Sequence, residues 1–292
     1  MTALLLDGHE PARRLLEQAA AKALALRDAL GRPPRLAALV AGRNPGALAY
    51  WERIGKFAKA AHVETVLADV TADSIFDELE RLNADSTVDG ILPFAPLPQG
   101  IELARIAAVL SPTKDVDGLT PHNAGLLARG LPGLYPCTPQ AAIALAEETL
   151  GDLRGVEATV VGASIHVGRP LAELLLQRGA TVTIAHIDTR DLAASCRKAD
   201  LLFVAVGKAG LLNARHLKQE ATVIDIGINL IDGDDGMKRI VGDVEFDSAA
   251  RAARAISAVP DGVGPLTTAF LISNTVHAAA SGRNAGTGTE IL

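Results

Sequence analysis

Small residues between Thr159 and Asp188 have the types and spacing that suit dinucleotide binding. A short apolar run ends at Val161, and Gly162 lets the chain turn sharply where the predicted strand ends. Gly168 lies at the start of the next predicted helix, whose unpaired N–H groups attract a pyrophosphate. The spacing is not G-x-G-x-x-G, so an ordinary strand-to-helix turn stays open as an alternative. The residues expected to contact the cofactor here are Gly162, Ala163, Ser164, Val167 and Gly168.

Three later segments place further candidate residues at the ends of predicted strands. Asp188 lies where dinucleotide-binding proteins carry an acid for the adenosine ribose, roughly 20 residues after the glycines. Small or kinked residues also follow the next two strands, which lets backbone approach a ligand closely. Because carboxyl ends of parallel strands meet at one edge, we add these residues to the cofactor site: His186, Ile187, Asp188, Val206, Gly207, Gly227, Ile228 and Asn229.

The elements that must position these residues alternate between strand and helix. In the first half, we predict strands over residues 36–41, 63–69 and 88–94, and helices over 10–30, 47–61, 72–83 and 102–110. In the second half, we predict strands over 158–161, 181–186, 201–205 and 222–226, and helices over 138–149, 168–178, 189–198 and 267–280. This alternation is typical of parallel sheets with crossover helices, so we expect an α/β protein.

Composition favours two domains and excludes several classes of partner. The chain has 292 residues, of which 49% are hydrophobic and 21% charged, enough for two cores of roughly 100–200 residues each. A net charge of −6 without a Lys/Arg cluster argues against nucleic acid. No uninterrupted apolar stretch reaches about 18 residues, so we expect a soluble protein without a membrane partner. Cys137 and Cys196 lack metal-ligand spacing, so we expect no metal, no disulfide framework and a reducing cytoplasm.

Four motifs give this sequence its resemblance to a known family. They are PTKDVDG at 112–118, PCTP at 136–139, VIDIGIN at 223–229 and GVGPLT at 262–267. In this order and at this spacing they resemble the methylenetetrahydrofolate dehydrogenase/cyclohydrolase family, and the likeness runs from about residue 3 to residue 280. Several independent motifs in register make the match more specific than any one of them.

The resemblance implies two α/β domains with a cleft between them and a homodimeric protein. Residues 1–140 with 267–283 would form the folate-binding catalytic domain, and residues 141–266 a Rossmann-type dinucleotide-binding domain. The Gly- and Thr-rich tail, residues 284–292, we expect to be disordered. The implied reaction is NAD(P)-dependent oxidation of 5,10-methylenetetrahydrofolate to 5,10-methenyltetrahydrofolate. Bifunctional members then hydrolyse that product to 10-formyltetrahydrofolate.

The resemblance also assigns roles to residues of the folate site. Asp117 matches the aspartate that hydrogen-bonds the pterin, and Tyr50 the tyrosine that packs on the folate, so both are candidate catalytic residues. A turn-forming aspartate and a core aromatic are the plain structural alternatives. Thr267 would do no more than cap the last helix if it has no ligand. The full predicted substrate set is Tyr50, Ile54, Phe94, Pro96, Asp117, Gly262, Pro265 and Thr267.

Two substitutions in the folate motifs predict a change in activity. Bifunctional members of the family carry Tyr-x-x-x-Lys, but here Ile54 stands four residues after Tyr50. Lys56 lies about 200° further round an ideal helix from that position and cannot simply replace it. Phe94 stands where the family has the glutamine that partners this lysine. Because both members of a polar pair have become apolar, we predict weak or absent cyclohydrolase activity with the dehydrogenase retained.

The cofactor motifs depart from the family in a way that favours NAD over NADP. NADP-using members read Gly-Arg-Ser at the first turn and Cys-His-Ser after the second strand. This chain has Ala163 and Ile187 at the arginine and serine positions, and Asp188 adds a negative charge. A phosphate beside a carboxylate is unfavourable, whereas a ribose diol can donate to it. Arg169 or Arg190 keeps NADP possible.

Other functions stay open on the sequence alone. The apolar positions 54 and 94 allow an enzyme that acts on another folate derivative, and a folate-binding paralogue without turnover is a second alternative. A general hydroxy- or amino-acid dehydrogenase would need an acid/base beside the nicotinamide, for which His166, His186 and His277 are the candidates. A hydrolytic site rebuilt on Glu52 or Lys56 is a further alternative.

Overall fold

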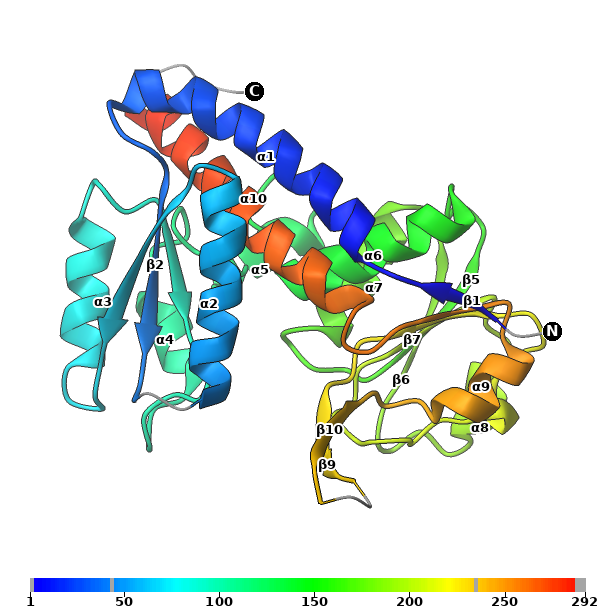
Figure 1. Ribbon diagram of the computed structural model, residues 1–292. Coiled ribbons are helices and arrows are strands. Elements are labelled where there is room, and N and C mark those ends of the chain that lie inside the picture. The colour runs from blue at the N-terminus through cyan, green and yellow to red at the C-terminus, as the bar shows by residue number, and fades with distance from the viewer. Residues whose placement is uncertain (1–2, 43–44, 234–235, 287–292) are drawn as a thin grey trace. The chain divides into compact units, whose positions relative to one another are not determined.

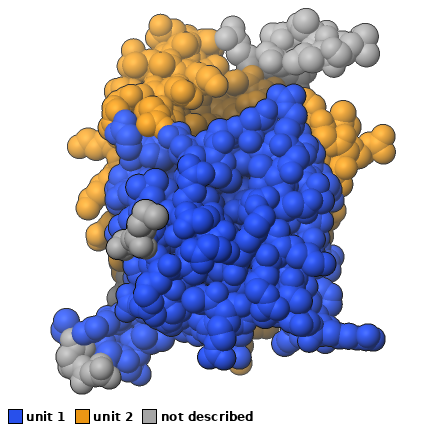
Figure 2. Space-filling model, turned by 90° about the vertical axis from the view of Figure 1, so that its right-hand side faces the viewer, with its two compact units in different colours: residues 1–12, 138–267 blue, residues 13–137, 268–292 orange. Residues whose placement is uncertain are grey.

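The chain folds into two compact units in a computed structural model that describes residues 3–42, 45–233 and 236–286 (Figure 1). Unit 1 comprises residues 1–12 and 138–267, and unit 2 comprises residues 13–137 and 268–292 (Figure 2). Two of the boundaries between the units fall inside the long helices α1 (His9–Leu30) and α10 (Val263–Gly286), and the third follows Cys137, the first residue of α6.

Unit 2 is built on a three-stranded parallel sheet in the order β3-β2-β4. Leu36, Ala38 and Val40 of the central strand belong to one core cluster, while Ala37 and Leu39 belong to another. Alternate side chains therefore fill a core on each face of the sheet, with α1, α2 and α10 on one face and α3 and α4 on the other (Figure 1). The elements are β2 (Arg35–Val40), α2 (Pro45–Ala60), β3 (Glu64–Asp69), α3 (Ile75–Ala84), β4 (Gly90–Pro93), α4 (Leu103–Val109) and α5 (Pro121–Ala128).

Unit 1 contains a six-stranded parallel sheet in the order β1-β11-β8-β7-β5-β6. Strand β6 lies beside β5 on one side, and the chain then returns to place β7 on the other side of β5. The sheet strands are β1 (Leu4–Leu6), β5 (Glu157–Val161), β6 (Thr181–Ala185), β7 (Leu201–Val204), β8 (Thr222–Asp225) and β11 (Ala255–Ser257). The other elements are α6 (Cys137–Leu150), α7 (Gly168–Gln177), α8 (Leu192–Cys196), η1 (Ala214–His216), the hairpin β9 (Asn229–Asp232) with β10 (Lys238–Val241), and α9 (Phe246–Ala252).

The predicted class, two α/β domains with a Rossmann-type C-terminal domain, is confirmed. The domain limits need one correction: residues 1–12 belong to unit 1, because β1 pairs in parallel with β11 at the edge of the six-stranded sheet. A lone three-residue strand has no sequence signal of its own, since its partner lies some 250 positions along the chain. Residues 284–286 of the predicted tail belong to α10, and its later residues lie outside the described part of the chain.

No helix in the described part of the chain is long and apolar enough to cross a membrane. Nor do three or more His, Cys, Asp or Glu side chains in that part of the chain gather in a way that could hold a metal ion.

Candidate active site

The sheet of unit 1 has a topological switch point, and predicted cofactor residues flank it. Strand order reverses between β5 and β7, whose carboxyl ends lead into Gly162 and Val206 respectively. In open α/β sheets, ligands bind outside the carboxyl ends of the strands at such a point. The topology therefore places two segments chosen from the sequence, residues 162–168 and 206–207, at neighbouring strand ends.

The first turn needs glycine at both of its ends. Gly162 has φ +117°, and a Cβ there would lie 2.2 Å from the carbonyl oxygen of Ala205. A Cβ on Gly168 would lie 1.9 Å from the carbonyl oxygen of Gly162, so α7 starts directly against the end of β5. The backbone N–H of Val167 donates to Ser164 Oγ over 3.1 Å. The turn is thus a close-packed backbone surface at a helix N-terminus, the chemistry that fits a pyrophosphate.

Asp243 holds two other predicted cofactor segments in place, residues 206–208 and Asn229. It was not identified from the sequence. Its buried carboxylate accepts hydrogen bonds from the backbone N–H groups of Val206, Gly207 and Lys208 at 2.6, 2.9 and 2.8 Å. It also accepts one from Asn229 Nδ2 at 2.8 Å. One side chain therefore fixes two segments predicted to hold the cofactor. Its local sequence, VGDV at 241–244, places an acid directly after a glycine but lies outside the four family motifs.

A second buried carboxylate, Asp225, lies beside Asp243. It accepts hydrogen bonds from the backbone N–H groups of Gly227, Asp243 and Val244 at 3.0, 3.0 and 2.9 Å. Burial raises the pKa of Asp225 to about 6, an effect opposed by these hydrogen bonds and reinforced by the charge of Asp243. A Cβ on Gly227 would lie 2.2 Å from Asp243 Cγ, so this turn also needs glycine.

The segment after β6 is open to solvent. The side chain of Ile187 is 98% exposed, and that of Asp188 is 86% exposed. His186 Nδ1 lies 3.6 Å from Asp188 Oδ2 and accepts a hydrogen bond from the backbone N–H of Asp188. Arg169 is anchored at the neighbouring first turn, where its Nε donates to the carbonyl oxygen of Ala163 over 3.1 Å. An acid and a cation thus both lie near the predicted adenosine end.

The glycine-rich segment before α10 differs from the prediction. The helix begins at Val263, so Thr267 is not its N-cap: Thr267 Oγ1 donates to the carbonyl oxygen of Val263 over 3.1 Å, one turn inside the helix. Pro265 lies in the first turn, where a proline needs no N–H partner. Gly262 is buried, and a Cβ there would lie 2.6 Å from the carbonyl oxygen of Ala258.

In unit 2, Tyr50, Phe94 and Ile54 lie together in one apolar cluster. The rings of Tyr50 and Phe94 are 5.3 Å apart between centroids, and Trp51 meets Phe94 edge-on at 6.4 Å. Ile54 is completely buried in the same core cluster, and Phe94 is 5% exposed. Lys56 is exposed, as the helical geometry predicted. Pro96 follows a cis peptide bond and is exposed.

Asp117 lies in a loop that several buried polar groups hold in place. One carboxylate oxygen accepts the backbone N–H of Cys137 over 3.1 Å, which ties the PTKDVDG motif to the PCTP motif. Asn274 of α10 donates to the carbonyl oxygens of Val116 and Tyr135 at 2.8 and 2.9 Å and so holds both motifs as well. Asp115, fully buried, accepts from the backbone of Leu119 and Thr120. Asn274 and Asp115 were not identified from the sequence.

The surroundings of Tyr50 keep its phenol neutral. Burial raises its pKa to about 12, and the charge of Asp117 acts in the same direction. The charge of Arg53 and a hydrogen bond with the Thr268 side chain act in the opposite direction. At neutral pH Tyr50 therefore offers a ring face and a hydroxyl, and no phenolate is available as a base. His166, His186 and His277 are all exposed.

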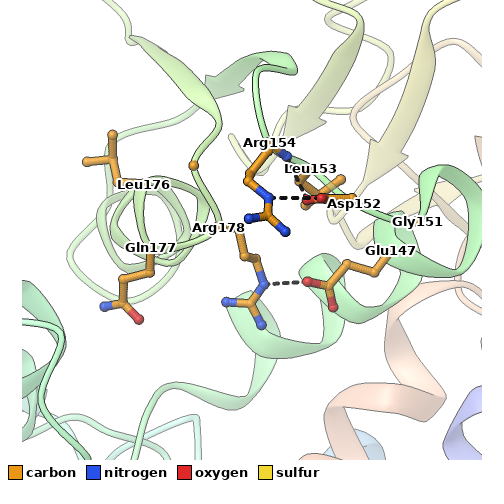
Figure 3. A pocket seen from close by; sticks show the side chains of 9 residues that line it. Glu147, Gly151, Asp152, Leu153, Arg154, Leu176, Gln177 and Arg178 are labelled. Carbon is orange, nitrogen blue, oxygen red and sulfur yellow. Dashed lines mark hydrogen bonds and ion pairs between the residues drawn. The ribbon is translucent and has the colours of Figure 1, made fainter.

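Two pockets in unit 1 are lined by other residues than those predicted. One, of about 400 Å³, contains Arg154 and Arg178, which pair with Asp152 at 2.9 Å and Glu147 at 2.5 Å (Figure 3). The other, of about 550 Å³, is largely apolar and reaches Asp225. Each guanidinium in the first pocket already has a carboxylate partner, so we do not assign a ligand to it.

Comparison with known proteins gives consistent matches along the chain. Residues 6–117 match the catalytic-domain model of the tetrahydrofolate dehydrogenase/cyclohydrolases, and residues 136–283 match their NAD(P)-binding-domain model. The chain is 45% identical to the bifunctional protein FolD of Nitrobacter hamburgensis over 285 residues, 96% of this chain and 97% of that protein.

Solved structures agree with these matches. The bifunctional FolD enzyme of Campylobacter jejuni has a TM-score of 0.88 and 36% identity, covering 96% of this chain and 99% of that one. The methylenetetrahydrofolate dehydrogenase-cyclohydrolase of Trypanosoma brucei, solved with NADP and an inhibitor, has a TM-score of 0.88 and 31% identity, covering 97% and 99%.

Proposed function

Since the chain belongs to the tetrahydrofolate dehydrogenase/cyclohydrolase family, we propose that it catalyses NAD(P)-dependent oxidation of 5,10-methylenetetrahydrofolate to 5,10-methenyltetrahydrofolate. The observation that carries this proposal is the switch point of unit 1, where the glycine turn at positions 162–168 forms a backbone surface suited to a pyrophosphate and residues 206–207 lie at the neighbouring strand end. In the reaction a methylene C–H bond breaks, and its electron pair leaves with the hydrogen as hydride. The oxidised folate carbon keeps the resulting positive charge, shared with its nitrogens.

The protein's own residues bind and orient the reactants. The bound dinucleotide supplies the hydride acceptor. The glycine turn at 162–168 and the N-terminus of α7 would hold its phosphates, and Asp243 fixes the neighbouring turn at 206–208. In unit 2, Asp117 accepts hydrogen bonds and suits the amino-pyrimidine edge of the pterin, while Tyr50 offers its ring for packing. Because hydride transfer moves no proton, the absence of a phenolate at Tyr50 does not hinder it.

For the second reaction of the bifunctional family members, we propose that hydrolysis of the methenyl product is weak or absent in this chain. Water attack on this carbon needs a proton acceptor and polar groups that hold the water. Position 54 is a completely buried isoleucine and position 94 a buried phenylalanine, and both lie in the apolar cluster beside Tyr50. A 10-formyltetrahydrofolate assay tests this. Enzyme-dependent hydrolysis at a rate near that of the dehydrogenase would contradict it, and Ile54→Lys/Phe94→Gln should raise the hydrolysis rate.

For the cofactor, we propose a preference for NAD over NADP. Ala163 and Ile187 provide neither cation nor hydroxyl for a 2′-phosphate, and the exposed carboxylate of Asp188 opposes one. Arg169 acts against this preference, since its Nε donates to the carbonyl oxygen of Ala163 and so holds a positive charge at the first turn. Steady-state kinetics with both dinucleotides decides between them, and a higher kcat/KM with NADP would overturn the proposal.

We also propose that the chain works as a homodimer in a reducing compartment such as the cytoplasm. The hairpin β9–β10 exposes Leu230 and Ile240 at 62% and 46%, and exposed apolar side chains that gather on one element suit a protein interface. Cys137 and Cys196 are both free and buried. Light scattering on a sizing column tests the dimer, and a monomer mass at micromolar concentration would contradict it.

The decisive experiment is a spectrophotometric assay of 5,10-methylenetetrahydrofolate oxidation with NAD and NADP side by side. We expect NAD-dependent formation of the methenyl product. Binding of tetrahydrofolate without any turnover would instead favour a non-catalytic folate-binding paralogue. Turnover confined to a different folate adduct would favour the other alternative left open by positions 54 and 94.

A further inference from the structure

Arg53 brings a positive charge to the helix face from which the family's lysine has been lost. Residues three apart on a helix are neighbours on its surface, so Arg53 lies on the same side of α2 as Tyr50. Its guanidinium carbon is 4.8 Å from the centroid of the Tyr50 ring. The charge is close enough to lower the pKa of Tyr50 against the larger effect of burial. A cation has thus moved from position 54 to position 53.

The guanidinium of Arg53 has an unsatisfied donor. Its Nε is buried and has no hydrogen-bond partner among the described residues. A buried donor without an acceptor destabilises the fold, more so when it is charged, so native proteins rarely leave one unpaired. In this stacking the flat face of the guanidinium contacts the Tyr50 ring, while the N–H donors at its edge still require acceptor oxygens.

We propose that Arg53 is a substrate-binding residue whose side chain shifts when the folate binds, so that its buried Nε donates a hydrogen bond to a carbonyl oxygen of the folate. The inference rests on the proposed function, because it takes the folate to lie against Tyr50. Asp117 already acts on Tyr50 with a negative charge, so a neutral carbonyl completes the site with less repulsion than a second carboxylate does. The pterin carbonyl and the benzoyl carbonyl share this chemistry, and the glutamate carboxylates do not.

Arginine in this place binds but does not exchange protons. Its guanidinium stays charged at every accessible pH, whereas a lysine in an apolar pocket can lose its proton. Arg53 therefore recovers the binding contribution of a cation beside Tyr50 without restoring acid/base chemistry. This accounts for a site that keeps a charged group while positions 54 and 94 have become apolar.

The test compares Arg53→Met and Arg53→Lys with a matched control. Arg105→Met removes an arginine that stacks on Phe76 at 4.9 Å, in the same unit and away from Tyr50. We expect Arg53→Met to raise KM for 5,10-methylenetetrahydrofolate at least tenfold, with KM for the dinucleotide unchanged. Arg53→Lys should lie between Arg53→Met and the wild type, and Arg105→Met should match the wild type.

A substrate without glutamate and a direct binding measurement complete the experiment. The tetrahydropteroate analogue should show the same dependence on Arg53, whereas loss of that dependence would assign the contact to a glutamate carboxylate and overturn the carbonyl assignment. An unchanged folate KM in Arg53→Met, or an equal rise in both KM values with a lower Tm, overturns the proposal. If the wild type proves inactive, titration calorimetry with tetrahydrofolate still decides, since Arg53→Met should weaken binding by the same factor.

Discussion

The two units build their candidate binding surfaces from different materials. At the switch point of unit 1 the surface is backbone, shaped by the glycines at 162, 168 and 227. The carboxylates of Asp225 and Asp243 accept hydrogen bonds from the backbone at Gly227 and Val206 and so fix these neighbouring segments. Around Tyr50 in unit 2 the surface is side chain: two aromatic rings, an isoleucine and a stacked arginine. A backbone surface serves a pyrophosphate that needs N–H donors, and a side-chain surface serves an aromatic substrate.

This difference explains where each unit tolerates change. The side chains around Tyr50 can be exchanged one at a time, and this chain carries two such exchanges, at positions 54 and 94, relative to the family's pattern. The turns in unit 1 leave no room for a Cβ at the three glycines, and the N–H groups of Gly207 and Gly227 are held by Asp243 and Asp225 respectively. We therefore expect substitutions to change the chemistry in unit 2 and the choice of dinucleotide in unit 1, while the three glycines of the turns stay unchanged.

The largest effect is expected from Asp243→Asn. The amide has one acceptor oxygen, and its NH₂ group faces backbone donors, so hydrogen bonds to Val206, Gly207 and Lys208 cannot all persist. We expect unfolding by urea to require about 4 kcal/mol less free energy, and KM for the dinucleotide to rise at least about tenfold. Asp247→Asn, an exposed residue of α9, is the control and should match the wild type. An unchanged dinucleotide KM in Asp243→Asn would show that these turns do not bind the cofactor.

Much of the backbone surface was predictable from sequence, and the groups that support it were not. Gly162 and Gly168 were identified because glycine at a strand-to-helix turn has a local physical cause. Asp243 supports Val206 from 37 positions away, so no local pattern connects them. In unit 2, Ile54 and Phe94 stood out only against the family's motif. Arg53 was missed because its role depends on a ring stacking that the three-residue spacing permits but does not require.

The free energy of unfolding should depend on pH through the ionisation of Asp225. The folded-state pKa of Asp225 is raised to about 6 from 3.8, so the folded protein binds the proton more tightly than the unfolded chain. The stabilisation from that proton is complete below pH 3.8 and is lost as the pH rises through 6. Relative to Asp225→Asn, the wild type should therefore lose up to about 3 kcal/mol of unfolding free energy between pH 4 and pH 7. Urea titrations at four pH values measure this, and a constant difference between the two proteins would contradict it.

Adding a cation to the first turn should change cofactor choice without disturbing the turn. Ala163→Arg/Ile187→Ser supplies a charge and a hydroxyl at positions that are partly or fully open to solvent. We expect the ratio of kcat/KM for NADP to that for NAD to rise about tenfold, equivalent to about 1.4 kcal/mol. Gln177→Arg adds the same charge at the other end of α7 and should leave the ratio unchanged. An equal ratio in all three proteins would mean that Arg169 already fulfils this role.

The smallest expected effect tests the side-chain surface directly. Phe94→Leu keeps an apolar side chain at a buried position and removes the ring contacts with Tyr50 at 5.3 Å and Trp51 at 6.4 Å. Aromatic pairs contribute about 0.5–1.5 kcal/mol beyond their buried area, so we expect a loss of about 1 kcal/mol in stability. The folate KM should rise a few-fold as Tyr50 loses its support, while the dinucleotide KM stays constant.

Phe246→Leu, a partly exposed phenylalanine of α9 in unit 1, is the control for Phe94→Leu and should change neither KM. Together with Asp243→Asn the design is reciprocal, since one variant changes the KM of the dinucleotide and the other that of the folate. If Phe94→Leu raised both KM values alike, the side-chain surface of unit 2 would not be specific for folate, and the division of labour between the two units would be wrong.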